Sequence, residues 1–208
     1  MLTGTACCRG SVKQKTSRPP HKSSPCMDNQ TTEVTPEPAF HIRAAKPADV
    51  PALMRLKRLL AEAEGSVDVV RASAADWLRA GFGPHPGFSA YVAEMDEAVV
   101  GMATCSRRII TGWNGPVVFL QDLFVESGYR RHGIAAALLA RVAAFASAIG
   151  SPIVELTVRA DNAAARTFYD RSGFQPLPQC LTYVLAGPAL ANLARADQAG
   201  NEPLALAG

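Results

Sequence analysis

Apolar and polar residues follow one another in patterns that predict a mixed α/β domain. Strand-like runs, in which β-branched and aromatic residues are frequent, fall at residues 40–44, 89–94, 98–110, 117–125, 151–158 and 181–185. Stretches with an apolar stripe at helical spacing fall at 48–63, 74–80 and 134–149. A further short helix is predicted between Asn162, a good amino-terminal cap, and Gly173, a good helix stop.

One junction between a strand and a helix carries most of the functional information. A short basic turn follows the fourth predicted strand and leads into an apolar helix that begins at Ile134. The first N–H groups of a helix lack intrahelical partners, and the helix dipole adds partial positive charge to them. Gly133 allows close backbone approach, Ala135 keeps the first helical turn slim, and Arg130 and Arg131 add positive charge. We expect a pyrophosphate to bind here.

Two motifs at this junction and beyond it resemble those of a known superfamily. The pattern Arg-x-x-Gly-x-Ala at 130–135 resembles the acyl-CoA loop of the GNAT superfamily of N-acetyltransferases, and Asn-x-x-Ala-x-x-Phe-Tyr at 162–169 is similar to its second CoA motif. Residues 113–125 resemble more narrowly the strand that leads into the active site of spermidine/spermine and diamine acetyltransferases. The resemblance covers residues 40–185.

The resemblance implies the GNAT fold, of class α/β (α+β), with a mixed central sheet of about six to seven strands flanked by about four helices. It also implies that acetyl-CoA is the co-substrate. The residues that would bind acetyl-CoA lie at the strand end, in the turn, in the first helical turn and in the second motif: Leu123, Phe124, Val125, Arg130, Arg131, His132, Gly133, Ile134, Ala135, Asn162 and Phe168.

Acetyl transfer to an amine needs two proton movements. An alkylammonium, with a reference pKa of about 10.4, must lose a proton before it attacks, and the leaving thiolate is helped by receiving one. In the family the tyrosine at the place of Tyr169 gives a proton to the CoA sulfur, so Tyr169 is the expected acid. The alternative is a core tyrosine with a satisfied hydroxyl. Asn162 would hold the pantetheine arm, cap its helix, or do both.

At the position of the expected base this chain differs from the diamine enzymes. Those enzymes have Glu followed by Asp where this chain has Gln121 and Asp122. An amide cannot accept a proton at neutral pH. We therefore expect Asp122 to bind or deprotonate the amine and Gln121 to contact the substrate. Adjacent strand residues face opposite sides unless a bulge intervenes, and the resemblance implies one, because the family's strand often has such a bulge. Glu94 and Glu126 are alternative bases. The same change weakens the case for polyamine specificity.

Positive charge is concentrated in the first 26 residues, which hold five Lys and Arg and no acid, so that the rest of the chain carries −2 of the net +3. We expect residues 1–38 to be a disordered leader, basic and then Pro-rich, with Met27 a candidate natural start. Residues 39–186 would form the acetyltransferase domain and 187–208 a flexible tail. The mildly acidic domain argues against a nucleic-acid enzyme, although the leader alone could be a nucleic-acid or membrane arm.

The two cysteines outside the first 26 residues, Cys105 and Cys180, fit neither a disulfide framework nor a zinc site. We therefore expect a cytoplasmic protein, no metal, and a core role for Cys105. No apolar run is long enough for a transmembrane helix. The expected partners are a small-molecule amine and, from the resemblance to the diamine enzymes, a second copy in a homodimer, with neither nucleic acid nor membrane.

Two classes of function stay open at this point. The first is an acetyl-CoA-dependent N-acetyltransferase that acts on the primary amine of a small molecule (a diamine, polyamine or amino-acid-like amine), or on an amino group of a protein. The second is a non-catalytic acyl-CoA-binding sensor module, for which Gln121 at the Glu position is the supporting feature. Retention of Tyr169 favours the enzyme, and the fold cannot name the acceptor.

Overall fold

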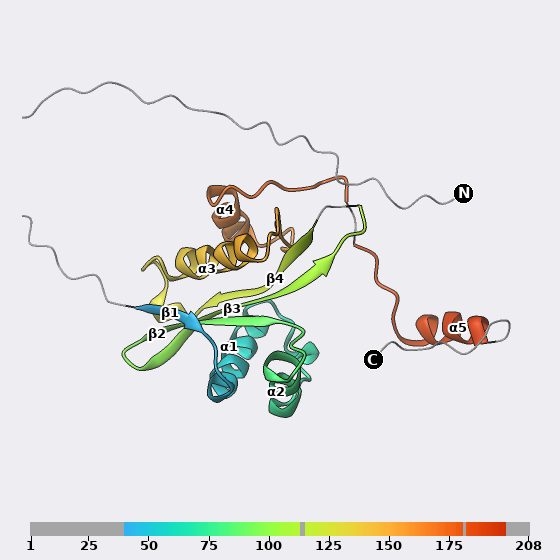
Figure 1. The fold of residues 1–208 in the computed structure, drawn as a ribbon, viewed down its shortest axis with the longest axis horizontal. Helices are drawn as coiled ribbons and strands as arrows, with labels where there is room; N and C mark the ends of the chain where they lie inside the picture. Colours follow the sequence, from blue (N-terminus) through green and yellow to red (C-terminus); the bar gives the residue numbers. More distant parts are fainter. Residues whose placement is uncertain (1–39, 113–114, 181, 199–208) are drawn as a thin grey trace, which may run out of the picture. The chain divides into compact units, whose positions relative to one another are not determined.

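The computed structural model describes residues 40–112, 115–180 and 182–198. The predicted leader and residues 199–208 lie outside the described residues. Trp113, the first residue of the segment that resembles the diamine enzymes, also lies outside them. The chain divides into two compact units, one of residues 18–173 and one of residues 1–17 and 174–208. The larger unit contains the sheet and both layers of helices in Figure 1.

The larger unit is built on one five-stranded sheet in the order β1-β2-β3-β4-β5. The strands are β1 (His41–Ala44), β2 (Ser89–Met95), β3 (Ala98–Ile109), β4 (Pro116–Val125) and β5 (Val154–Leu156). The first four are antiparallel to their neighbours, and β5 joins β4 in parallel. The turn between β2 and β3 holds Asp96 and Glu97 at φ 49° and 62°, which suits the tight hairpin turn expected there. The predicted mixed sheet is confirmed.

The strand count is lower than the six to seven expected. No strand forms at residues 182–185, and Leu181, the first residue of the predicted strand, lies outside the described residues. An apolar, β-branched run forms a strand only where a neighbouring strand pairs with it, and Tyr183 and Val184 are exposed instead. The segment expected to be a flexible tail begins with helix α5 (Gly187–Gln198), which belongs to the smaller unit.

Helices cover both faces of the sheet. Helices α1 (Val50–Ala63) and α2 (Ala74–Phe82) lie on one face, and α3 (Ile134–Ala148) and α4 (Ala163–Arg171) on the other (Figure 1). Helix α2 falls on the predicted stretch 74–80 and is capped by Ser73, whose hydroxyl accepts the Asp76 N–H while the Asp76 carboxylate accepts the Ser73 N–H. None of the helices in the described part of the chain combines the length and apolarity of a membrane span.

The sheet is buried on both faces, which fixes where α1 and α3 lie. A core cluster on the α1 face includes Leu53, Leu56, Val92, Met102 and Phe124. On the other face α3 buries the stripe that its spacing predicts. The buried residues of α3 are Ile134, Leu138, Leu139, Val142 and Ala146. At Gly101 an added Cβ would come within 3.1 Å of the Phe124 carbonyl oxygen and 3.3 Å of the Ile134 side chain. This glycine therefore lets the start of α3 pack directly over β3.

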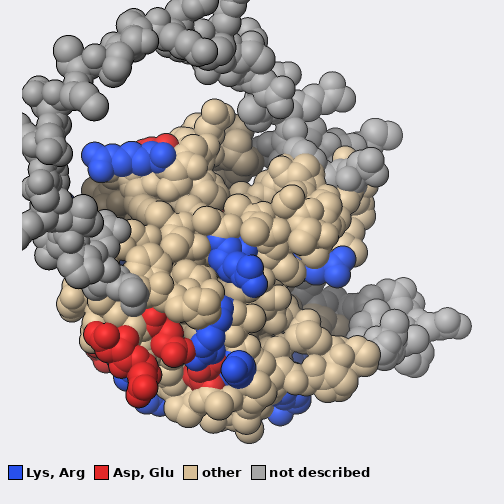
Figure 2. All heavy atoms as spheres, turned by 60° about the vertical axis from the view of Figure 1, so that its left-hand side comes forward, with Lys and Arg blue, Asp and Glu red and all other residues tan. Residues whose placement is uncertain are grey.

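Charged side chains lie in separate groups on the face shown in Figure 2. Acidic side chains gather in one region, while Lys and Arg lie singly or in small groups among uncharged residues. Among the described residues visible there, the basic groups form no continuous band of the kind that contacts a phosphate backbone. That nucleic acid is not a partner stays a prediction from the sequence.

Candidate active site

Strand β4 contains a bulge, as the resemblance to the family led us to expect. Thr104 of β3 pairs with Asp122, but the next residue, Cys105, pairs with Leu120, so Gln121 is the extra residue. Consecutive residues of a regular strand point to opposite faces. The bulge instead lets Gln121 and Asp122 line the same cavity. The expected bulge is confirmed.

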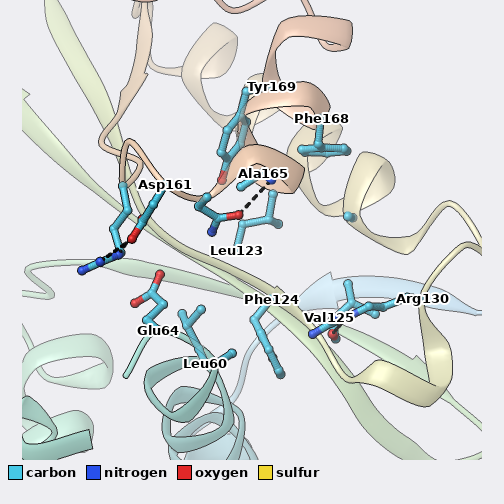
Figure 3. A pocket seen from close by; sticks show the side chains of 14 residues that line it. Leu60, Glu64, Leu123, Phe124, Val125, Arg130, Asp161, Ala165, Phe168 and Tyr169 are labelled. Carbon is cyan, nitrogen blue, oxygen red and sulfur yellow. Dashed lines mark hydrogen bonds and ion pairs between the residues drawn. The ribbon is translucent and has the colours of Figure 1, made fainter. Parts of the chain in front are cut away.

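Strands β4 and β5 part just beyond the bulge. Their parallel pairing ends at Leu120 and Leu156, and the chain after β5 leads to α4. Among the described residues, no strand therefore pairs with one edge of residues 123–125. The space between the separated segments is a cavity of about 610 Å³ (Figure 3). The open strand edge can pair with the amides of an extended ligand, as sheet edges pair with added strands.

The turn at the far end of this cavity has the geometry of an anion nest. The φ angles alternate in sign, at −74° for Arg130, positive at 74° for Arg131, negative for His132 and positive at 78° for Gly133. Such alternation points successive N–H groups into one concavity. Gly133 is the amino-terminal cap of α3, and an added Cβ there would meet no atom within 4 Å. The space beside the turn is therefore open to a phosphate.

The two arginines of the turn have different positions. The Arg130 Nε donates to the Val125 carbonyl oxygen at 2.9 Å, and its guanidinium lies 5.6 Å from the centre of the Phe124 ring. Arg130 thus fastens the turn to the end of β4 while lining the cavity. Arg130, Arg131 and His132 are all exposed, and the His132 Nδ1 lies 3.3 Å from the Tyr129 carbonyl oxygen. Of the two arginines, Arg130 is therefore the one that the structure fastens beside the nest.

The opposite wall of the cavity is the start of α4. Asn162 caps this helix as expected, with its Oδ1 accepting the Ala165 N–H at 3.0 Å. Asn162, Phe168 and Tyr169 all line the cavity, and the Phe168 and Tyr169 ring centres are 5.4 Å apart. Tyr169 points from α4 into the cavity, and Glu64 at the end of α1 reaches in from the other side (Figure 3).

The phenol of Tyr169 is held in its protonated form. Burial raises the pKa of Tyr169 above its usual value of 10.0, and the negative charges of Glu64 and Asp122 raise it further. These two carboxylates come from α1 and β4 respectively. At neutral pH Tyr169 therefore keeps its proton and can donate it into the cavity. Glu64 was not among the site residues predicted from the sequence.

A second cavity, of about 490 Å³, is lined by residues of α1, α2 and the sheet and by Thr157 just after β5. Its aromatic wall comes from three side chains, Trp77, Phe88 and Phe119. Asp122 lines this cavity and Leu123 lines the first. Because these residues are consecutive, the two cavities approach each other at this point of β4.

Asp122 is already bound by two donors. Its Oδ1 accepts from the Lys57 Nζ at 2.5 Å and its Oδ2 from the Thr104 Oγ1 at 2.7 Å, with the Asp122 side chain only 10% exposed. Neither Lys57 nor Thr104 was among the residues predicted from the sequence. Lys57 follows Leu53 by one helical turn and lies next to Leu56, at the border of the buried stripe. That position was the available signal.

The alternative bases lie elsewhere. Glu94 forms an ion pair with Arg43 at 2.7 Å and Glu126 with Arg55 at 2.7 Å, and neither lines a cavity described above. Cys105 is buried, and burial raises the pKa of its thiol to about 11, which suits the expected core role. Within the described residues no three His, Cys, Asp or Glu side chains gather as a metal site would require.

Comparison with known proteins places the chain in a family. Residues 53–174 match the Acetyltransferase (GNAT) family. The thialysine N-epsilon-acetyltransferase of Bos taurus is 33% identical over 146 residues, which are 66% of this chain and 85% of that protein. Its counterpart in Mus musculus is 32% identical over 164 residues, 74% of this chain and 96% of that protein. The chain belongs to the GNAT acetyltransferase family and is an acyltransferase.

A human relative and two solved structures extend the comparison. The spermidine/spermine N(1)-acetyltransferase-like protein 1 of Homo sapiens is 32% identical over 141 residues, 64% of this chain but only 20% of that protein. An integron cassette protein from the mobile metagenome of V. cholerae aligns with a TM-score of 0.61 at 23% identity, over 75% of this chain and 98% of that one. An aminoglycoside N-acetyltransferase in complex with CoA aligns with a TM-score of 0.58 at 20% identity, over 71% and 95%. The likenesses to the two solved structures show the fold. Acetyl-CoA is the co-substrate that GNAT acetyltransferases use.

Proposed function

We propose that this chain transfers the acetyl group of acetyl-CoA to the primary amine of a small molecule by direct attack. The observation that carries the proposal is the close approach of two cavities at the consecutive residues Asp122 and Leu123. One cavity has an anion nest at its end and a tyrosine in its wall, as a CoA thioester requires. The other has an aromatic wall and a carboxylate, as an amine requires.

The first cavity would bind acetyl-CoA along its whole length. The pyrophosphate would accept hydrogen bonds from the N–H groups of Gly133, Ile134 and Ala135, with Arg130 and Arg131 supplying charge. The pantetheine amides would pair with the open edge of residues 123–125 and with Asn162. This arrangement brings the thioester toward Tyr169, at the place where the two cavities approach each other.

The reaction would proceed in one attack with two proton movements. The neutral amine nitrogen forms the C–N bond to the thioester carbonyl carbon, and the C–S bond then breaks. Tyr169 donates its phenolic proton to the departing sulfur. The excess proton on nitrogen passes to Asp122, directly or through a water molecule. Gln121, beside it on the bulge, would contact the acceptor without taking a proton.

Replacing Asp122 by Asn is expected to affect the amine and leave the cofactor unaffected. Asp122→Asn should keep the acetyl-CoA Kd, because Asp122 lies outside the first cavity. It should raise the acceptor KM or move the pH dependence of kcat/KM upward, since the amide can neither pair with a cation nor relay a proton. Steady-state kinetics with a calorimetric Kd test this, and an unchanged acceptor KM together with an unchanged pH profile would remove Asp122 from the reaction.

Gln121→Glu is the complementary change. It adds a carboxylate to the second cavity at the position where the diamine enzymes have one. Activity toward diamines should increase if that acid is what this chain lacks. If the rates with every amine stay the same, the proton leaves by another path, such as an ordered water or the neutral fraction of the substrate.

We also propose that the chain is a cytosolic homodimer. The resemblance to the diamine enzymes supports pairing, and so does the 84% exposed Ile109 at the end of β3, an apolar side chain that a two-fold contact could cover. The proposed compartment rests on the cysteine usage. Light scattering at micromolar concentration should give twice the chain mass, and a monomer there would overturn the dimer.

A further inference from the structure

We propose that Lys57 sets the acceptor specificity, so that the enzyme acetylates a monoamine with an apolar body in preference to a diamine or polyamine. The inference rests on the proposed function and adds the substrate class. A polyamine carries several positive charges, and its recognition needs carboxylates that are free to pair with them. The second cavity offers few such groups, because its carboxylates already have cationic partners.

The charged groups around the second cavity are paired within the protein. Three of them line it, namely Lys57, Asp76 and Asp122. Asp122 is bound by Lys57 at 2.5 Å, and Asp76 accepts from Arg79 at 2.5 Å as well as from Ser73. Beyond the aromatic wall, Arg108 lies 4.4 Å from the centre of the Phe119 ring and pairs with Glu155. A second ammonium group on the acceptor would therefore have to displace one of these partners.

Lys57 occupies the position that a substrate ammonium would take beside Asp122. Its side chain is 31% exposed against 10% for Asp122, so the lysine is the more accessible member of the pair, and both line the cavity. A cationic acceptor meets the positive charge of Lys57 before it reaches Asp122. The same positive charge favours the neutral form of an entering amine, which is the form that attacks the thioester. Lys57 thus opposes a second cation and favours the reactive state of a single amine.

The remaining wall suits an apolar body. Trp77 and Phe88 meet edge to face with ring centres 5.4 Å apart, and Phe119 supplies a third ring. Aromatic faces bury apolar groups and tolerate one nearby cation without requiring a second carboxylate. An amine attached to a phenyl or alkyl group therefore matches this wall better than a flexible polycation does.

A matched pair of amines tests the inference. Phenethylamine and its 4-aminomethyl derivative differ by one aminomethyl group, which adds a second ammonium, and kcat/KM for each is measured by thiol release from acetyl-CoA. Wild-type enzyme should prefer the monoamine. Lys57→Met frees Asp122 and should shift the ratio of the two kcat/KM values toward the diamine by about fivefold, the factor of one favourable charge pair. Arg58→Met removes an exposed charge next to Lys57 that lines neither cavity, and should leave the ratio unchanged.

A double variant separates charge from shape. Lys57→Met with Asp122→Asn removes both charges, so the cavity gains no free carboxylate and the ratio should stay at the wild-type preference for the monoamine. The inference is overturned if wild-type enzyme prefers the diamine, or if Lys57→Met leaves the ratio unchanged while its melting temperature shows that it is folded. If no amine is acetylated by any variant, the proposed function fails. In that case the Kd values of the monoamine and the diamine, measured by calorimetry in wild type and Lys57→Met, test the role of Lys57, because their ratio should shift in the same direction.

Discussion

Gly133→Asp is expected to abolish the thermal stabilisation that acetyl-CoA gives to the wild-type protein. At saturating ligand, about 100 times Kd, that stabilisation is about 2.7 kcal/mol. Gly133 has φ +78°, which costs a residue with a Cβ about 1 kcal/mol or more, and the aspartate would place a negative charge in the open space of the nest. Melting temperatures with and without acetyl-CoA measure the loss.

Two control variants separate the causes. Gly133→Ala adds backbone strain without charge and should keep part of the stabilisation. Gly128→Asp adds the same charge in the same turn, at a glycine with no positive φ and open space around it, and should retain far more of the cofactor affinity. If Gly133→Asp binds acetyl-CoA as tightly as wild type does, the nest is not the pyrophosphate site.

Tyr169→Phe is expected to keep the acetyl-CoA Kd and to lower kcat by about 10²-fold or more, the usual scale for one general acid. The phenyl ring preserves the cavity wall, but no proton is available for the sulfur. Tyr183→Phe, at an exposed position in the smaller unit, removes the same hydroxyl without an expected effect. Single-turnover kinetics together with a measured acetyl-CoA Kd distinguish cofactor binding from acetyl transfer. An unchanged kcat in Tyr169→Phe would assign the proton to another donor.

The pH dependence of kcat follows from the upward shift of the Tyr169 pKa. Burial and two carboxylates raise it above 10.0, so the acid form is present throughout the neutral range. An acid stops working as the pH rises through its pKa. Wild-type kcat should therefore fall only above about pH 10, and the residual activity of Tyr169→Phe should lack that decrease.

Local sequence signals predicted the elements that position the site. The apolar stripe of α3, the caps at Ser73 and Asn162, and the glycine at the start of α3 all have a physical meaning within a few residues. A bulge in this strand was expected from the resemblance to the family, and the structure places its extra residue at Gln121. Each of these features depends on the local chain or on one adjacent strand.

Features that depend on distant residues were missed. Lys57 and Asp122 are 65 positions apart, so nothing near Asp122 in the sequence showed that its carboxylate is bound. The strand predicted at 181–185 needed a pairing partner that local composition cannot supply. The left-handed conformation of Arg131 could not be predicted either, because arginine does not favour a positive φ, whereas the glycine at 133 does.

The central claim is that this GNAT protein acetylates a primary amine, and one measurement tests it most directly. Wild-type protein is incubated with acetyl-CoA and a panel of monoamines, diamines and amino acids, while thiol release is followed and the amine products are identified by mass spectrometry. The account predicts thiol release that requires both the amine and Tyr169, with one acetyl group added to the amine nitrogen. Binding of acetyl-CoA without amine-dependent thiol release on any acceptor would contradict it and indicate an acyl-CoA sensor.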